Sequence, residues 1–288
     1  KPMPVKVILL PLSEVDAPAP VLETALGLAQ RFQAHLEVLY VMRNPRNLLP
    51  YATIGLSKHM REAVLQAAEQ NAVSQATQAR ELLDKLCAEA GVPIGSAPPE
   101  VTGPSASWRE TTGQEDTILA VRGRLSDLIL LPGPIPVSPP PAFVEAALKS
   151  TGRPVLVAPP RLEPVIGSRI GIGWNGSSEA ARAVGAAMTY LHTAEAVTIL
   201  TGRRQEDVHP SPGELVDYLG WHGVQADVKI VDAHDPHVGE ALLKVCRDTG
   251  INMLVGGGYS RSRLRELILG GVTGHLLNSA EIPVFMVH

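Results

Sequence analysis

Glycine and serine gather in two stretches in the second half of the chain, where they could hold an anion. The stretches read "WNGSS" (174–178) and "GGGYSRSRLRELILGGVT" (256–273), and the longer one contains five glycines. Small residues let backbone N–H groups approach an anion closely, and N–H groups at a helix start meet it with aligned dipoles. The pattern therefore predicts a phosphorylated ligand. The alternative is a tight turn after a buried strand, followed by an ordinary helix that starts at Gly270.

The longer stretch departs from two common phosphate-binding patterns. It lacks the lysine of the GxxxxGK[ST] loop, and Arg261 stands where GxGxxG has its last glycine. The guanidinium groups of Arg261, Arg263 and Arg265 could contact phosphate, because their N–H groups match its oxygens. Positions that face solvent or another subunit are the alternative for all three.

Two further features admit both a functional and a structural interpretation. "DAHDPH" (232–237) offers His234, His237 and two aspartates as metal ligands. Asp235 followed by Pro236 is, however, typical of a helix start, so we interpret the segment as a helix cap and expect no metal. Trp174 could stack on a base or pack at the end of its strand.

The sequence contains none of the catalytic motifs that we searched for. There is no GxSxG elbow, no HExxH and no pair of acids in the glycine-rich stretches. Nothing near Gly257 resembles a general base that could activate water against a phosphoanhydride. We therefore assign no catalytic residue, and we expect any hydrolysis of ATP to be slow.

The elements that must position these residues alternate between strands and helices, which predicts an α/β fold with parallel sheets. In the first half, strands are expected at 5–12, 35–42, 127–133 and 153–160, and helices at 21–33 and 142–150. A long helix spans about 57–90 and ends at Gly91, before an irregular stretch rich in Pro, Ser and Gly. Its apolar face is expected at Met60, Val64, Ala68, Ala72, Ala79, Leu83 and Leu86.

The second half repeats this plan from Ser168. Strands are expected at 169–175, 196–201, 224–232, 251–257 and 283–288, and helices at 177–191, near 213–223, at 236–250 and after the glycine stretch. The sequence therefore predicts two domains, residues 1–160 and 168–288, joined by the short linker "APPRLEPVIGS". A length of 288 residues is consistent with two hydrophobic cores.

Composition excludes several classes of protein. With 45% hydrophobic and 19% charged residues, the chain has the balance of a soluble globular protein, and its apolar runs are too short to span a membrane. The net charge of −4 argues against a nucleic-acid partner. No signal peptide is visible, so we expect a cytoplasmic protein. Cys87 and Cys246 have no paired spacing and are expected to pack as small hydrophobic residues.

The segment "MLVGGGYSRSRLRELILGGVTGHLLNSAEIPVFMV" resembles the carboxyl-terminal signature of the universal stress proteins, and "IGIGWNGSSEAARAV" resembles the start of the same domain. The first half is similar more weakly, through "VKVILLPLSE", "DLILLPG" and "GRPVLVAPP". The whole chain thus resembles a tandem universal stress protein. The resemblance implies two open parallel five-stranded sheets of the adenine nucleotide alpha hydrolase-like type, each in the order 3-2-1-4-5, which pair antiparallel through their last strands.

Many members of that family bind ATP or AMP through a G-x2-G-x9-G-(S/T) loop. Its four positions fall on Gly257, Ser260, Gly270 and Gly271, so two depart from the pattern, and Thr273 could supply the missing hydroxyl. Asn175 stands where the family has an acid, and backbone near Thr201 and Gly202 would meet adenine. The implied ligand is ATP, ADP or AMP, with or without Mg²⁺, and the implied site is Trp174, Asn175, Gly176, Ser177, Thr201, Gly202, Gly256, Gly257, Ser260, Gly270, Gly271, Val272 and Thr273.

The first repeat has lost these features. Ser13 stands at the acidic position, and "LLPGPIPVSPPPAF" replaces the glycine loop with prolines, which lack N–H donors. We therefore expect a nucleotide only in the second domain, and a regulatory or sensing role in the stress response. The halves would form an internal pseudo-dimer, and two chains could associate further. A scaffold with no nucleotide, and an ATP or metal-dependent hydrolase, are the alternatives.

Overall fold

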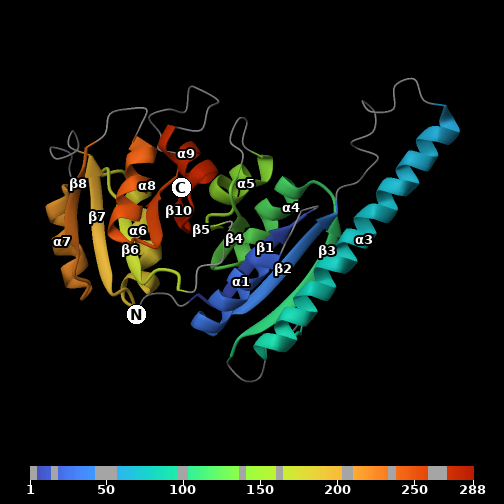
Figure 1. The fold of residues 1–288 in the computed structure, drawn as a ribbon, viewed down its shortest axis with the longest axis horizontal. Coiled ribbons are helices and arrows are strands. Elements are labelled where there is room, and N and C mark those ends of the chain that lie inside the picture. Colours follow the sequence, from blue (N-terminus) through green and yellow to red (C-terminus); the bar gives the residue numbers. More distant parts are fainter. Residues whose placement is uncertain are drawn as a thin grey trace.

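The structure is a computed structural model, shown in Figure 1. It describes residues 5–13, 19–42, 57–95, 103–135, 141–159, 165–202, 210–232, 238–258 and 271–288. Strands and helices alternate along the chain in both halves. The first half contains β1 (Val7–Leu12), α1 (Ala19–Phe32), β2 (His35–Met42), α3 (Lys58–Ala90), β3 (Ser105–Thr112), α4 (Glu115–Arg122), the short 3-10 helix η1 (Gly123–Leu125), β4 (Leu128–Pro132), α5 (Ala142–Ser150) and β5 (Val155–Ala158).

The second half repeats the alternation after the predicted linker. It contains β6 (Arg169–Gly173), α6 (Ser178–Leu191), β7 (Ala196–Gly202), α7 (Pro212–Trp221), β8 (Asp227–Val231), α8 (Val238–Thr249), β9 (Met253–Gly257), α9 (Gly271–Ser279) and β10 (Val284–Val287). None of the described helices combines the length and the apolar character that crossing a membrane requires.

The strands form one ten-stranded sheet instead of the two sheets that were expected. Its order is β3-β2-β1-β4-β5-β10-β9-β6-β7-β8, so each half has the predicted order 3-2-1-4-5. All neighbouring strands run parallel except β5 and β10, which pair antiparallel with Leu156 opposite Phe285. The hydrogen bonds of this central pair join the halves into a single sheet, because an edge strand offers unpaired N–H and C=O groups to its neighbour.

Helices cover both faces of the sheet, and alternation along the strands divides the buried residues between two cores. One core contains Ile8, Leu10 and residues of α1, α3, α6 and α7. The other contains Leu9 and residues of α4, α5, α8 and α9. Helices change face after the third strand of each half because the winding direction reverses there, which creates the crevice that ligands use in open parallel sheets.

An aromatic cluster adds a second contact between the halves. Phe32 of α1 meets Tyr190 of α6 edge to face at 4.9 Å between ring centroids, and Tyr190 meets Phe285 of β10 at 5.6 Å. Arg31 places its guanidinium over the Phe32 and Tyr190 rings and donates hydrogen bonds to the Ile166 carbonyl and the Thr193 hydroxyl. The two halves therefore share side-chain packing as well as a sheet.

The long helix α3 and the stretch after it differ from the expectation. Ser57 caps the start of α3 and Gly91, at φ 65°, ends it. The predicted apolar face is buried only in part, because Ala72, Ala79 and Leu83 are buried whereas Met60 and Val64 are exposed. The stretch expected to be irregular contains β3 and α4.

Candidate functional site

The second half brings three predicted stretches to the same edge of the sheet. β6 lies between β7 and β9, and Gly173 at its end is in register with Leu200 and with Gly256. Because these strands are parallel, residues 174–177, 201–202 and 256–258 lie at three neighbouring carboxyl ends. α9 then begins at Gly271, so Val272 and Thr273 lie in its first turn. The carboxyl ends of such strands are where ligands bind in this class of sheet.

Gly257 approaches the first turn of α6 more closely than any other residue type could. A Cβ atom at this position would lie 2.7 Å from the Ala180 nitrogen and 2.7 Å from the Glu179 Cβ. Neighbouring Gly256 has no atom within 4 Å of the corresponding point, and neither does Gly271. Glycine at 257 is therefore required by packing, since a backbone atom of a helix cannot give way as a flexible side chain does.

The stretch before α6 forms a turn and a helix cap. The Ser177 N–H donates to Asn175 Oδ1 at 3.1 Å, and the Ala180 N–H donates to Ser177 Oγ at 3.2 Å. Gly176 has φ 70°, which glycine adopts readily. The Asn175 side chain is exposed, and its Oδ1 is the atom that accepts the turn hydrogen bond from Ser177. Asn175 therefore offers a ligand hydrogen-bond donors, because its oxygen serves the turn.

Trp174 lies in the core, where packing accounts for it. Its side chain is 5% exposed, its backbone N–H donates to the Leu200 carbonyl, and its indole N–H donates to the Pro210 carbonyl at 2.8 Å. The ring is enclosed by the residues of its own core cluster. Of the two interpretations given to Trp174, the structure agrees with packing at a strand end.

Thr201 has a buried hydroxyl, unpaired within the described ranges, that the sequence did not predict. The residue is 2% exposed at the carboxyl end of β7, next to Gly202, and its Oγ1 atom has no hydrogen-bond partner among the described residues. A buried hydroxyl without a partner costs about 1–3 kcal/mol. A hydrogen bond to a polar atom of a bound molecule would explain why this hydroxyl has no partner in the described part of the protein.

Glu179 is a second residue that the sequence did not single out. It is 4% exposed beside Gly257, and its Oε1 accepts from Arg182 Nη2 at 3.3 Å. Burial alone would raise the pKa of Glu179, but hydrogen bonds from its own N–H and from Ser178, and the nearby Arg182 charge, hold that pKa below its usual value. The sequence feature that could have identified Glu179 is its position as an acidic residue in the first turn of a predicted helix.

Arg182 extends this contact to the end of the chain. Its Nε donates to the His288 carbonyl at 3.0 Å, and His288 Nδ1 lies 3.1 Å from the Gly258 carbonyl. The first turn of α6, the end of β9 and the chain terminus are thereby tied together. The ion pair of Glu179 with Arg182 is neutral as a whole, so it does not repel an anion at the neighbouring glycines.

The corresponding place in the first half has different chemistry. Ile8 and Ile170 hold the same register to the fourth strand of their halves, so Ser13 corresponds to Asn175. Pro132 ends β4 as Gly257 ends β9. The Gly133 N–H donates to the Ala158 carbonyl at 2.9 Å and the Ile135 N–H donates to the Leu277 carbonyl of α9 at 2.8 Å. The Gly133 bond has a counterpart in the second half, where the Gly258 N–H donates to the Val287 carbonyl at 2.8 Å. The halves therefore differ at Pro132 and in the engagement of the Ile135 N–H.

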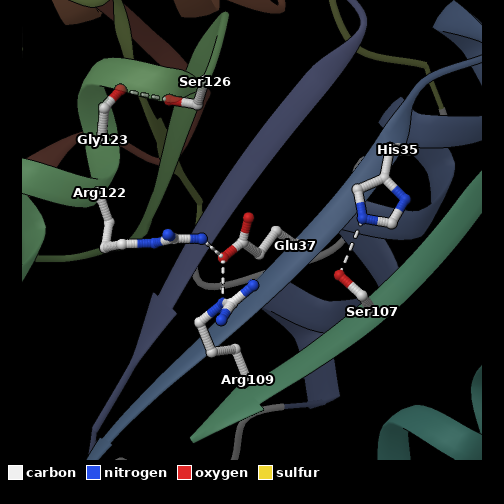
Figure 2. A network of polar contacts seen from close by, with 7 residues as sticks. All are labelled: His35, Glu37, Ser107, Arg109, Arg122, Gly123 and Ser126. Atoms are coloured by element: carbon white, nitrogen blue, oxygen red, sulfur yellow. Dashed lines mark hydrogen bonds and ion pairs between the residues drawn. The ribbon is translucent and has the colours of Figure 1, made fainter. Parts of the chain in front are cut away.

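A polar cluster in the first half lies along β2 and β3, and Figure 2 shows Glu37 between Arg109 and Arg122. Glu37 Oε1 accepts from Arg109 Nε at 2.9 Å and from Arg122 Nη2 at 2.7 Å. Burial alone would raise the pKa of Glu37, but these hydrogen bonds and the two positive charges hold it below its usual value. Glu37 is the third residue of β2 and Arg109 is the fifth of eight in β3, so the cluster lies away from the carboxyl ends of the strands and we interpret it as structural.

His35 begins β2 in the same cluster. Its Nδ1 and Nε2 lie 2.8 Å from the hydroxyl oxygens of Ser105 and Ser107, respectively. Burial lowers the pKa of His35, and the nearby Glu37 charge only partly opposes that effect. The neutral imidazole suits this place, because it can donate to one serine and accept from the other.

Several predicted residues lie outside the described part of the chain. They are Ser260, Gly270, the arginines at 261, 263 and 265, and residues 233–237 of the metal or helix-cap segment. Within the described ranges, no group of three or more His, Cys, Asp or Glu side chains is placed to hold a metal ion. Cys87 and Cys246 are both buried, and burial raises their thiol pKa to about 11 and about 12.

Comparison with known proteins assigns part of the chain. The family model of the Universal stress protein family matches residues 168–288. A curated universal stress protein of Synechocystis is 23% identical over 147 residues, which are 50% of this chain and 50% of that protein. The chain thus matches about half the length of this curated relative. Residues 168–288 carry a universal stress protein domain.

Solved structures resemble the chain over nearly its whole length. A universal stress protein of Archaeoglobus fulgidus DSM 4304 has a TM-score of 0.69 at 16% identity, with 98% of this chain and 97% of that chain covered. The cytoplasmic domain of a prokaryotic cation chloride cotransporter has a TM-score of 0.51 at 11% identity, with 98% and 94% covered. At these identities the likeness shows a shared fold.

Proposed function

We propose that the chain is a tandem universal stress protein that binds an adenine nucleotide in its second half and acts as a cytoplasmic regulator or sensor. The first half then completes the architecture without a nucleotide of its own. The family match of residues 168–288 and the repeated strand order support this reading. The ligand is ATP, ADP or AMP, with or without Mg²⁺.

The close packing of Gly257 is the observation that carries the proposal. It brings the backbone at the end of β9 against the first turn of α6, next to the strand end that leads to Asn175. Two backbone segments with small residues then lie against each other beside the start of a helix, where backbone N–H groups can bind phosphate. Pro132 at the equivalent place in the first half supports the assignment of a single nucleotide site to the second half.

Thr201 suggests how the base or ribose is held. Its buried hydroxyl lacks a partner among the described residues, and it follows Leu200, whose carbonyl accepts from the Trp174 N–H. A ligand atom that pairs with this hydroxyl would remove the cost of leaving it unsatisfied. Asn175 would add amide donors from the neighbouring strand end.

Thermal unfolding with ATP, ADP and AMP, each with and without Mg²⁺, tests the proposal. A nucleotide that binds only the folded chain stabilises it by about 2.7 kcal/mol at 100 times its Kd, which raises the melting temperature. Thr201→Val keeps the shape of the side chain and should reduce that stabilisation. Thr198→Val, at a position on the opposite face of β7, is the matched control and should leave it unchanged. No response to any of the nucleotides would contradict the proposal and favour the scaffold alternative.

Hydrolysis is less well supported than binding. Glu179 is the acid beside Gly257, and its pairing with Arg182 and lowered pKa make it a weak base. We therefore expect nucleotide to be bound more than turned over.

A further inference from the structure

The two edges of the ten-stranded sheet are protected differently. At the β3 edge, Ile94 forms a parallel bridge with Ala106, the Gly95 N–H donates to the Ala106 carbonyl at 2.8 Å, and the Ala106 N–H donates to the Pro93 carbonyl at 2.9 Å. At the β8 edge, no described segment pairs with the outer side of the strand. Figure 1 shows the two edges at opposite ends of the molecule, with α3 beside β3 and α7 beside β8.

The helix that covers the β8 end is also much shorter. α3 has 33 residues, whereas α7 has 10. Val228 and Ile230 are in register with Ile199 and Thr201 on the face that α7 covers, yet each is 44% exposed. Tyr218 and Trp221 of α7 are exposed as well, Trp221 by 90%. We call Tyr218, Trp221, Val228 and Ile230 the edge patch.

Exposed apolar side chains beside a strand edge that no described segment covers indicate a surface for strand pairing. Unpaired N–H and C=O groups accept another strand, and soluble proteins usually protect such an edge with charge, a bulge or a covering segment. An apolar group of this kind at one end of a molecule marks an interaction site. Strand addition would give the β8 backbone partners and cover the edge patch together.

The sequence of β8 is complementary to itself when two copies run antiparallel about Val228. Asp227 then lies opposite Lys229 of the second copy, and Lys229 opposite the second Asp227, on one face of the sheet. On the other face, Val228 meets Val228, and Ile230 meets Ala226. A two-fold axis at Lys229 would instead place two lysines directly opposite each other, which is destabilising.

We propose that two copies of the chain form a dimer by pairing β8 with β8, antiparallel, about a two-fold axis at Val228. The interface is isologous, as in most homodimers, because the same patch serves both copies. It joins two ten-stranded sheets into one continuous sheet. The charge pattern Asp227–Lys229 selects a second copy as the occupant, because each copy contributes one acid and one base and both are matched by the other copy.

Charge reversal tests the register. Size-exclusion chromatography with light scattering should give twice the mass of the chain for the wild type and the mass of one chain for Lys229→Asp. The double variant Asp227→Lys with Lys229→Asp exchanges the charges and should restore the dimer. Lys85→Asp, the same substitution at an exposed position of α3, is the matched control and should remain dimeric. A monomeric wild type, or a Lys229→Asp variant that stays dimeric, would overturn the proposal.

Cysteine cross-linking tests the position of the axis. Residues opposite each other in an antiparallel pair have Cα atoms about 4.5–5.5 Å apart, within the range of a disulfide. Val228→Cys should therefore form a covalent dimer with oxidised glutathione. Ile230→Cys places its two thiols four residues apart along the strands, about 14 Å, and should not. Cys87 and Cys246 are each 1% exposed, so they add no background. Equal cross-linking of both variants would refute an axis at Val228.

Discussion

At the scale of single residues, neighbouring glycines have different structural roles. Gly256 and Gly257 are adjacent in the stretch that predicted an anion site, but only Gly257 touches the backbone of α6. The glycines could be found from composition. The contact at Gly257, the unpaired hydroxyl of Thr201 and the buried carboxylate of Glu179 could not, because each depends on elements that are distant in the chain.

Gly257→Ala and Gly256→Ala should separate these two roles. The added methyl at 257 would lie 2.7 Å from the Ala180 nitrogen, so α6 or β9 must shift, and we expect the free energy of unfolding to fall by about 1–3 kcal/mol. At 256 the methyl meets open space, and we expect little change. Urea denaturation measures both. Equal losses at the two positions would show that the close approach is absent.

His35 should make stability depend on pH. Burial lowers its pKa below the ordinary 6.5, so the unfolded chain binds a proton more readily than the folded chain does. The free energy of unfolding is then highest above about pH 6.5, falls as the pH drops through that value, and levels off once the folded imidazole is also protonated. Glu37, whose pKa lies below 4.5, loses its contribution only at lower pH.

The measurement is urea unfolding of the wild type and of His35→Gln between about pH 8 and pH 5. The variant cannot titrate at this position, so the difference between the two curves isolates the imidazole from the other histidines. A difference that does not vary with pH would rule out His35 as its source.

At the scale of elements, the sequence predicted the apolar strands well and the polar one poorly. β2 was expected at 35–42 and is found there, because its core residues form a continuous apolar run. β3 reads "SASWRETT", which carries no such run, since it is an edge strand and most of it is half-buried or exposed. Pairing with β2 creates this strand.

For helix α3 the sequence predicted more burial than the structure has. Its periodicity predicted one apolar face along the whole helix, and Ser57 and Gly91 marked both ends. Burial depends on what lies opposite, and Leu83 packs in the core while Met60 is exposed. Amphipathic spacing identifies a face that can be buried, but the extent of the sheet decides how much of it is.

At the scale of the whole molecule, the pairing of β5 with β10 explains why five strands per half give one sheet of ten. The family resemblance implied an antiparallel pairing of the last strands, and β5 and β10 do pair in this way. Two sheets paired through their last strands were expected, and the hydrogen bonds of that pairing make them one ten-stranded sheet. The pairing of β5 with β10 also leaves β3 and β8 as the outer strands, which is why the edge patch lies at one end of the molecule.

The β5–β10 seam makes the chain a natural candidate for a split protein. Residues 1–160 and 168–288, expressed apart, would each expose strand backbone and apolar side chains such as Leu156 and Phe285, so each fragment alone should aggregate. Co-expressed, they should find each other and purify as a one-to-one complex, because the seam needs no covalent connection. Fragments that stay soluble and separate would mean that each half folds independently of the other. If the two fragments assemble, formation of the complex can be used to detect that both polypeptides are present in the same cell.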